Sequence, residues 1–300
     1  MWLSGRGMRS PTPGFREKRR VWLVAMGLGL GLMMAGVPFS EASEPTPSVL
    51  QPATDIDQVL QALGVFDQMA SVAGMLQSEL RALQSSSLFS PGDVSQVRRM
   101  LSNLREDQLY EQITAAIGQQ FTPDELQQLQ ALAQRSELRY LSTQEAQLRS
   151  PAQQEQLRLY RAQLRESPPA PKRLEWMQAL DHARYHSRFE TALKVSMRKS
   201  VLAAIAMVKT HQPLSEAALE QELRQYRGKL TEELQQQALN NYLYLYRKTP
   251  TESVQNTVEI YRDPLYQRLM SVCEQALVQS FRLAREKNED TVRVAEAIPQ

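Results

Sequence analysis

The chain has 300 residues, with 35 Lys and Arg against 33 Asp and Glu, and a formal net charge of +2. Residues 1–42 hold six of the basic and two of the acidic side chains, so the rest of the chain is slightly acidic and lacks the basic surplus of a dedicated nucleic-acid-binding protein. The single cysteine excludes an intramolecular disulfide and a multi-cysteine metal site.

The first 42 residues have the layout of a secretory signal peptide. An uncharged apolar run over 21–37 follows six basic side chains and ends at Pro38, and small residues precede a cleavage site between Ala42 and Ser43. We therefore predict an exported, periplasmic protein. The alternative is an uncleaved leader that tethers the protein to the membrane, although four glycines make this run marginal for spanning a core of ~30 Å.

The chain after the leader is rich in Leu, Ala, Glu, Gln and Arg and holds only five glycines, a composition typical of helices. Apolar residues recur at spacings of three and four. We predict an all-α protein, a bundle of roughly ten helices in antiparallel hairpins. A flexible tether over 43–54, helical subdomains over 55–166 and 174–288 and a flexible tail over 289–300 are expected, with a subdomain boundary at the prolines of 167–172.

Four predicted helix starts share one pattern, a hydroxyl residue followed by proline and, two residues later, a polar side chain. The hydroxyl residue would be the N-cap and proline the first helical residue. The predicted caps are Ser90, Thr122, Ser150 and Thr249. A further cap is expected at Thr231. The segment Tyr242–Tyr246 alternates like a strand, but it continues the helix expected after Thr231 and is predicted to be helical.

Two stretches about 108 residues apart have similar sequences, and each is predicted to form a helix, a turn and a capped second helix. The first, Phe121–Leu129, resembles the F-T-x-E-E-L-x-x-L signature of the bacterial exported helical family called domain of unknown function twenty fifty-nine. In family members, an element of aromatic residues followed by Ser-Pro comes after the signature. In the second stretch, Leu230–Leu234 leads to Leu245–Pro250, which resembles this element. In the first stretch, Gln134–Glu137 stands in its place. The resemblance implies an exported all-α protein with no assigned activity.

His182, His186 and Glu190 are the candidate metal ligands, because they stand four residues apart and would share one face of a single helix. One straight helix spreads such ligands over about 6 Å per turn, too far for all three to hold one ion. Arg184 and Arg188 would also repel a cation. We therefore predict no functional metal site.

The sequence contains no nucleophile motif and no glycine-rich phosphate loop, so we expect no catalytic site and no cofactor. Cys273 follows an apolar stripe and is expected to be buried, with an intermolecular disulfide as the alternative. Trp176 is expected to pack on the core. The predicted function is a non-enzymatic interaction or scaffold protein of the bacterial envelope with protein partners. The alternatives are a binder of a small hydrophobic or lipid-like ligand and a metal-dependent enzyme that uses His182 and His186.

Overall fold

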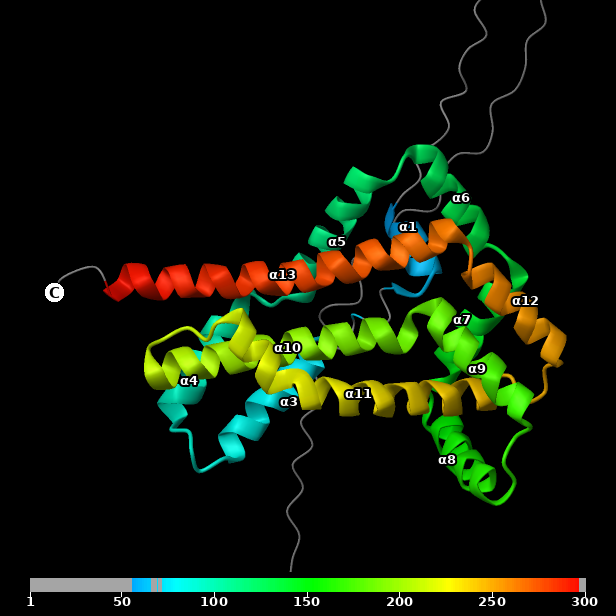
Figure 1. The fold of residues 1–300 in the computed structure, drawn as a ribbon, viewed down its shortest axis with the longest axis horizontal. Helices are drawn as coiled ribbons and strands as arrows, with labels where there is room; N and C mark the ends of the chain where they lie inside the picture. Colours follow the sequence, from blue (N-terminus) through cyan, green and yellow to red (C-terminus); the bar gives the residue numbers. More distant parts are fainter. Residues whose placement is uncertain (1–55, 66–68, 70–71, 297–300) are drawn as a thin grey trace, which may run out of the picture. The chain divides into compact units, whose positions relative to one another are not determined.

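The computed structural model describes residues 56–65, 69 and 72–296, with side chains up to Asn288. All regular secondary structure within these ranges is helical (Figure 1), which confirms the predicted all-α class. The leader 1–42, the cleavage site between Ala42 and Ser43 and the tether 43–54 lie outside the described residues and stay predictions.

The described helices follow one another through short connections. Their bounds are α1 (Ile56–Ala62), α3 (Val72–Ser85), α4 (Pro91–Met100), the 3-10 helix η1 (Leu101–Asn103), α5 (Glu106–Gln120), α6 (Pro123–Ala133), α7 (Ser136–Leu148), α8 (Pro151–Glu166), α9 (Pro171–Arg184), α10 (His186–Thr210), α11 (Glu216–Leu245), α12 (Thr251–Tyr261) and α13 (Pro264–Glu296).

Three of the four predicted caps are confirmed. The Ser90 hydroxyl accepts from the N–H of Asp93 at 3.1 Å, and the Asp93 carboxylate accepts from the N–H of Ser90 at 2.8 Å. Thr122 and Glu125 form the same reciprocal pair, at 3.3 and 2.9 Å. Ser150 accepts from the third N–H of α8 at 3.4 Å. Each cap satisfies a backbone donor that the helix itself leaves unpaired.

The predicted cap at Thr249 is wrong. Pro250 has extended backbone angles and is itself the N-cap, so α12 begins one residue later, at Thr251. The N–H of Thr249 donates to the carbonyl of Tyr246 at 2.8 Å, which places Thr249 in the turn that follows α11. Proline here precedes the helix, whereas at the three confirmed caps it is the first helical residue.

One hydrophobic core contains buried side chains from α1 through α13, and residues 51–300 form a single compact unit. Helices from before and after 167–172 pack directly on each other: α5 and α6 on α13, α7 on α12, and α8 on α11. The predicted subdomain boundary is therefore wrong. Its prolines mark only the connection between α8 and α9, because proline ends a helix whether or not a domain ends there.

The helix α11 is continuous over Glu216–Leu245, so the predicted turn and cap at Thr231 are wrong and the second copy of the repeat lacks the architecture of the first. The Thr231 hydroxyl instead donates to the carbonyl of Arg227 at 2.8 Å, within the helix. Tyr242–Leu245 lie in the last turn of α11, with Tyr246 as its C-cap, which confirms the helical prediction for this segment.

The longest helices, α10, α11 and α13, frame the region in which the polar cavities lie. In Figure 1, α10 runs beside α11, and both α11 and α13 pack against it. The helix α13 continues through Glu296, so the tail predicted from residue 289 is wrong over 289–296, where neither glycine nor proline interrupts the helix. None of the described helices combines the length and apolarity that crossing a bilayer requires.

Candidate functional site

A turn at Tyr185 separates α9 from α10 and organises the polar interior. Tyr185 has a φ of 58°, the left-handed conformation that few residues other than glycine adopt. The Asp181 carboxylate on α9 accepts from the backbone N–H of Ser187 at 3.0 Å and from its hydroxyl. Because Ser187 lies in the first turn of α10, Asp181 caps α10 from the preceding helix.

This turn overturns the expectation that His182, His186 and Glu190 share one helix. His182 lies on α9 and lines a large groove, whereas His186 and Glu190 lie on α10 and line a separate, smaller cavity. The Glu190 carboxylate pairs with the Lys194 ammonium at 2.8 Å. Across the described part of the chain, no group of three or more His, Cys, Asp and Glu is arranged to hold a metal ion.

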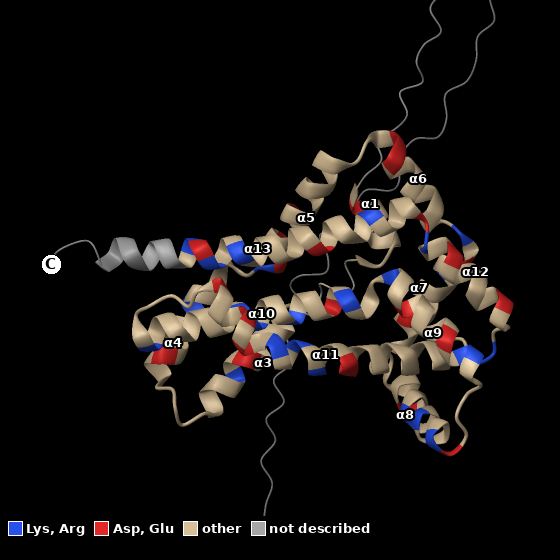
Figure 2. Cartoon of the chain, viewed as in Figure 1, with Lys and Arg blue, Asp and Glu red and all other residues tan. Residues whose placement is uncertain are grey.

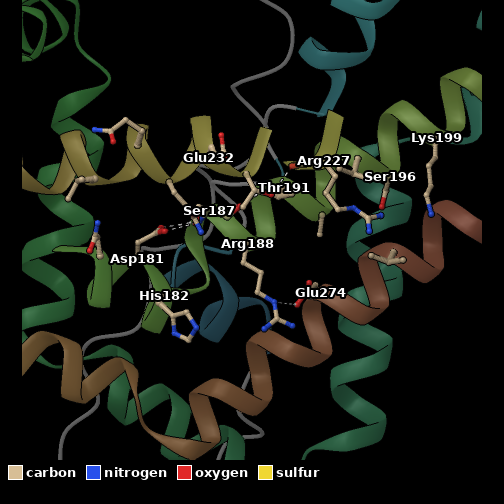
Figure 3. A pocket seen from close by; sticks show the side chains of 18 of the residues that line it. Asp181, His182, Ser187, Arg188, Thr191, Ser196, Lys199, Arg227, Glu232 and Glu274 are labelled. Carbon is tan, nitrogen blue, oxygen red and sulfur yellow. Dashed lines mark hydrogen bonds and ion pairs between the residues drawn. The ribbon is translucent and has the colours of Figure 1, made fainter. Parts of the chain in front are cut away.

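The large cavity, which we call the groove, is an open depression of about 1030 Å³ walled by α9, α10, α11 and α13 (Figure 3). Its floor includes Val195, which packs with Leu223, Leu230 and Leu234 of α11. Most of the residues that line it have polar side chains, although apolar atoms contribute more of its exposed surface than polar atoms do. The ionisable lining residues are Asp181, His182, Arg188, Lys199, Glu220, Arg227, Glu232 and Glu274.

Lys199 anchors the charged network at one end of the groove. Its side chain is only 7% exposed, and its ammonium lies 2.5 Å from the Glu216 carboxylate and also contacts Glu220. Arg285 of α13 pairs with Glu216 at 3.1 Å, and Arg227 pairs with Glu220 at 2.9 Å. Burial raises the pKa of both carboxyls, but their cationic partners outweigh it and hold each pKa below its ordinary value.

A second ion pair in the groove ties α10 to α13. Figure 3 shows Arg188 extended toward Glu274, and their closest atoms are 2.8 Å apart. The Arg188 guanidinium also lies over the Tyr185 ring, 4.5 Å from its centroid. Figure 2 shows that basic and acidic residues are interspersed along the described helices. In the groove, the ion pairs hold charges of both signs at fixed positions.

The smaller cavity, which we call the turn cavity, has a volume of about 300 Å³ and lies on the other side of the Tyr185 turn. Its wall contains Arg184, whose two terminal nitrogens lie 2.5 and 3.0 Å from the two carboxylate oxygens of Glu145. Arg184 also donates to the Tyr242 hydroxyl at 2.8 Å and lies over the Tyr261 ring. Burial raises the pKa of Glu145, but Arg184 outweighs it and holds the pKa below its ordinary value.

His186 faces this buried ion pair. Burial, and then the neighbouring Arg184, lower the pKa of its imidazole, so the ring is neutral at neutral pH. Its Nδ1 is buried and has no hydrogen-bond partner within the described chain. A buried nitrogen without a hydrogen bond lowers the stability of the folded protein, unless a further group such as a water or a ligand bonds to it.

Cys273 is fully buried on α13, which confirms the expectation of a buried side chain. Burial raises the pKa of its thiol to about 12, so the thiolate that forms disulfides is scarce at neutral pH. Trp176 is half-buried and packs against the core, as expected.

Neither Lys199 nor the Arg184–Glu145 pair was predicted from the sequence to form a site. One signal for Arg184 was present in the sequence: it lies seven residues after Met177 and four after Leu180, on the buried face of α9. A charged residue on an apolar stripe indicates a buried ion pair. No comparable signal marks Glu145, because its partner lies 39 positions along the chain.

Comparisons of the chain with protein-family models, with curated proteins and with solved structures find no match. The resemblance of Phe121–Leu129 to the exported helical family stays a prediction.

Proposed function

We propose that this is a non-enzymatic binding protein of the bacterial envelope, and that the groove receives a segment of a partner protein. One observation carries the proposal: the groove is a wide, open surface on which ion pairs between helices, Arg188–Glu274 and Lys199–Glu220, hold several charged side chains in place. Surfaces that are ordered before binding lose less conformational entropy when a partner docks.

The size and chemistry of the groove favour a polypeptide over a lipid-like ligand. Its volume of about 1030 Å³ lies at the upper limit for small-molecule pockets, so one small ligand would leave much of it unfilled. The groove also carries eight ionisable side chains of both signs, which a lipid-like ligand would not match. Paired charges at fixed positions reject partners that place like charges opposite them, and the exposed carboxylate of Glu232 favours a partner with a basic side chain at that point.

The metal-dependent enzyme is the less favoured alternative, because the Tyr185 turn directs His182 and His186 to different cavities. The envelope location rests on the predicted signal peptide, with its basic start, apolar run and cleavage site at Ala42.

Two neighbouring residues on α11 allow a matched test. Glu232 and Glu233 are both exposed, but only Glu232 lines the groove. The mature protein would be immobilised and incubated with envelope extract from its source, and retained proteins would be quantified by mass spectrometry. We expect Glu232→Lys to reduce the retained partner about tenfold and Glu233→Lys to retain the wild-type amount. Equal retention by all three proteins, or none above the blank, would contradict the proposal.

A further inference from the structure

We propose that the turn cavity is a binding site for a small, uncharged molecule that carries several hydroxyl groups, of about the size of a monosaccharide. This site is separate from the groove and does not depend on the partner proposed for it.

The turn cavity has a polar rim and a mostly buried floor. Ser142, Gln154 and Gln237 are exposed at its rim, whereas Tyr242 and Leu245 are buried beneath them. Its volume of about 300 Å³ lies at the lower end of the range for small-molecule pockets. A single small polar molecule that contacts buried apolar side chains and polar rim groups fits this anatomy.

The strongest indication of a ligand is the Nδ1 of His186. This atom is buried without a partner in a side chain that lines the cavity. The atom has almost no accessible surface, so a ligand reaches it only when the ring turns toward the cavity. A hydroxyl then satisfies it in either neutral tautomer of the ring, because a hydroxyl both donates and accepts hydrogen bonds. The lowered pKa of His186 keeps the ring neutral, so it does not call for an anion.

The charges around the cavity are already compensated. Arg184 is paired with Glu145 through both terminal nitrogens, and Glu190 is paired with Lys194. Arg149, also in the lining, is close enough to Glu145 to help lower its pKa. An ionised ligand would lose its hydration without gaining an uncommitted counter-ion from these pairs, and this favours an uncharged ligand.

Asn241 supplies an oriented amide in the same wall. Its Oδ1 accepts from the Arg161 guanidinium of α8 at 3.0 Å, which fixes the orientation of the amide and leaves Nδ2 as the donor for another partner. A neutral His186 nitrogen and an oriented amide are hydrogen-bonding groups that suit hydroxyl oxygens without a net charge.

The test uses saturation-transfer NMR on the mature full-length chain, with methyl glucoside and myo-inositol as uncharged probes and glutamate and lysine as charged ones. We expect saturation transfer to at least one uncharged probe and to neither charged probe. On the wild-type protein, that same probe should shift the Nδ1 resonance of His186. This second measurement needs no variant.

Two variants and a control place the site. Ala238→Leu fills the turn cavity, and His186→Leu removes the unpartnered nitrogen. Each should weaken binding at least about tenfold, the effect of losing roughly 1.4 kcal/mol. The control Ala192→Leu, in the groove, should bind as the wild type does. The proposal would be overturned if only charged probes bind or if Ala238→Leu leaves binding unchanged. It would also be overturned if the His186 resonance responds to no probe, because the cavity would then hold only water.

Discussion

Arg184 brings a guanidinium into the protein core, where it is 6% exposed. Its charge is balanced by two oxygens of Glu145, and the Tyr242 hydroxyl and the Tyr261 ring fill the rest of its surroundings. Burying a charge is tolerated only when such partners replace its hydration. The pair therefore fixes α7, α9 and α11 relative to one another at the turn cavity.

Replacing Arg184 by Met should destabilise the protein by about 3 kcal/mol, because the half-buried Glu145 carboxylate would lose the cation that balances it. Urea unfolding monitored by circular dichroism measures this loss. Arg158→Met is the matched control, since Arg158 pairs with Glu155 on the exposed surface of α8 and its loss should leave the unfolding midpoint unchanged. Equal midpoints for Arg184→Met and wild type would show that the buried pair does not hold these helices.

The two threonines of the predicted caps should behave differently. Thr122→Ala removes a hydroxyl that accepts from the N–H of Glu125 and should cost about 1 kcal/mol of unfolding free energy. Thr249→Ala removes a hydroxyl that makes no cap bond to α12 and should change stability by less than about 0.5 kcal/mol. A larger loss in Thr249→Ala than in Thr122→Ala would reverse the assignment of the caps.

At the scale of the helix, apolar periodicity and cap patterns predicted the starts at Ser90, Thr122 and Ser150, because these signals are local in sequence. The Tyr185 turn escaped prediction, since no glycine or proline marks it. It depends on a tyrosine in a left-handed conformation and on a cap supplied by Asp181. Both features lie within 181–187, but a tyrosine at the end of a helix is not a usual stop signal, so the metal-site geometry predicted on one continuous helix was wrong.

The Tyr185 turn should also give the protein a pH-dependent stability. The pKa of His186 is lowered in the folded state, so below about 6.5, its unfolded value, the unfolded chain binds a proton that the folded chain does not. Stability should therefore fall as pH falls from 7.5 to 5.5, by at most about 1.4 kcal/mol per pH unit from this group. The pKa of Glu145 is also lowered in the folded state, so the stability that its carboxylate contributes is lost only at more acidic pH, where the carboxylate is protonated.

Thermal melts across this pH range test the effect of His186. His186→Gln cannot take up the proton and should lose less stability than the wild type between pH 7.5 and 5.5. His182→Gln is the control, because His182 is exposed on α9 and lines the groove. Parallel curves for wild type and His186→Gln would mean that the imidazole is not buried as described.

At the scale of the molecule, the prolines at 167–172 suggested two subdomains, yet the described helices on both sides share one core. The sequence held no information on this point, because long-range packing between α5 and α13 or α7 and α12 leaves no local pattern. The positions of the cavities could not be predicted for the same reason: the lining residues come from helices far apart in the chain.

A shared core predicts cooperative unfolding. Trp176 is the sole tryptophan after the leader and reports on α9, whereas far-ultraviolet circular dichroism reports on all helices. The urea transitions followed by the two signals should coincide in the mature protein. Two separated transitions would instead support independent subdomains on either side of 167–172.

The central claim is that the groove binds a partner protein, and photo-crosslinking in the living source organism tests it most directly. A photoreactive amino acid would replace Gln235, which is exposed in the groove, and, as the control, Gln128, which is exposed on α6 away from it. We predict a discrete higher-mass adduct from position 235 and none from position 128. Adducts from position 128 alone, or the absence of any adduct from position 235, would contradict the account.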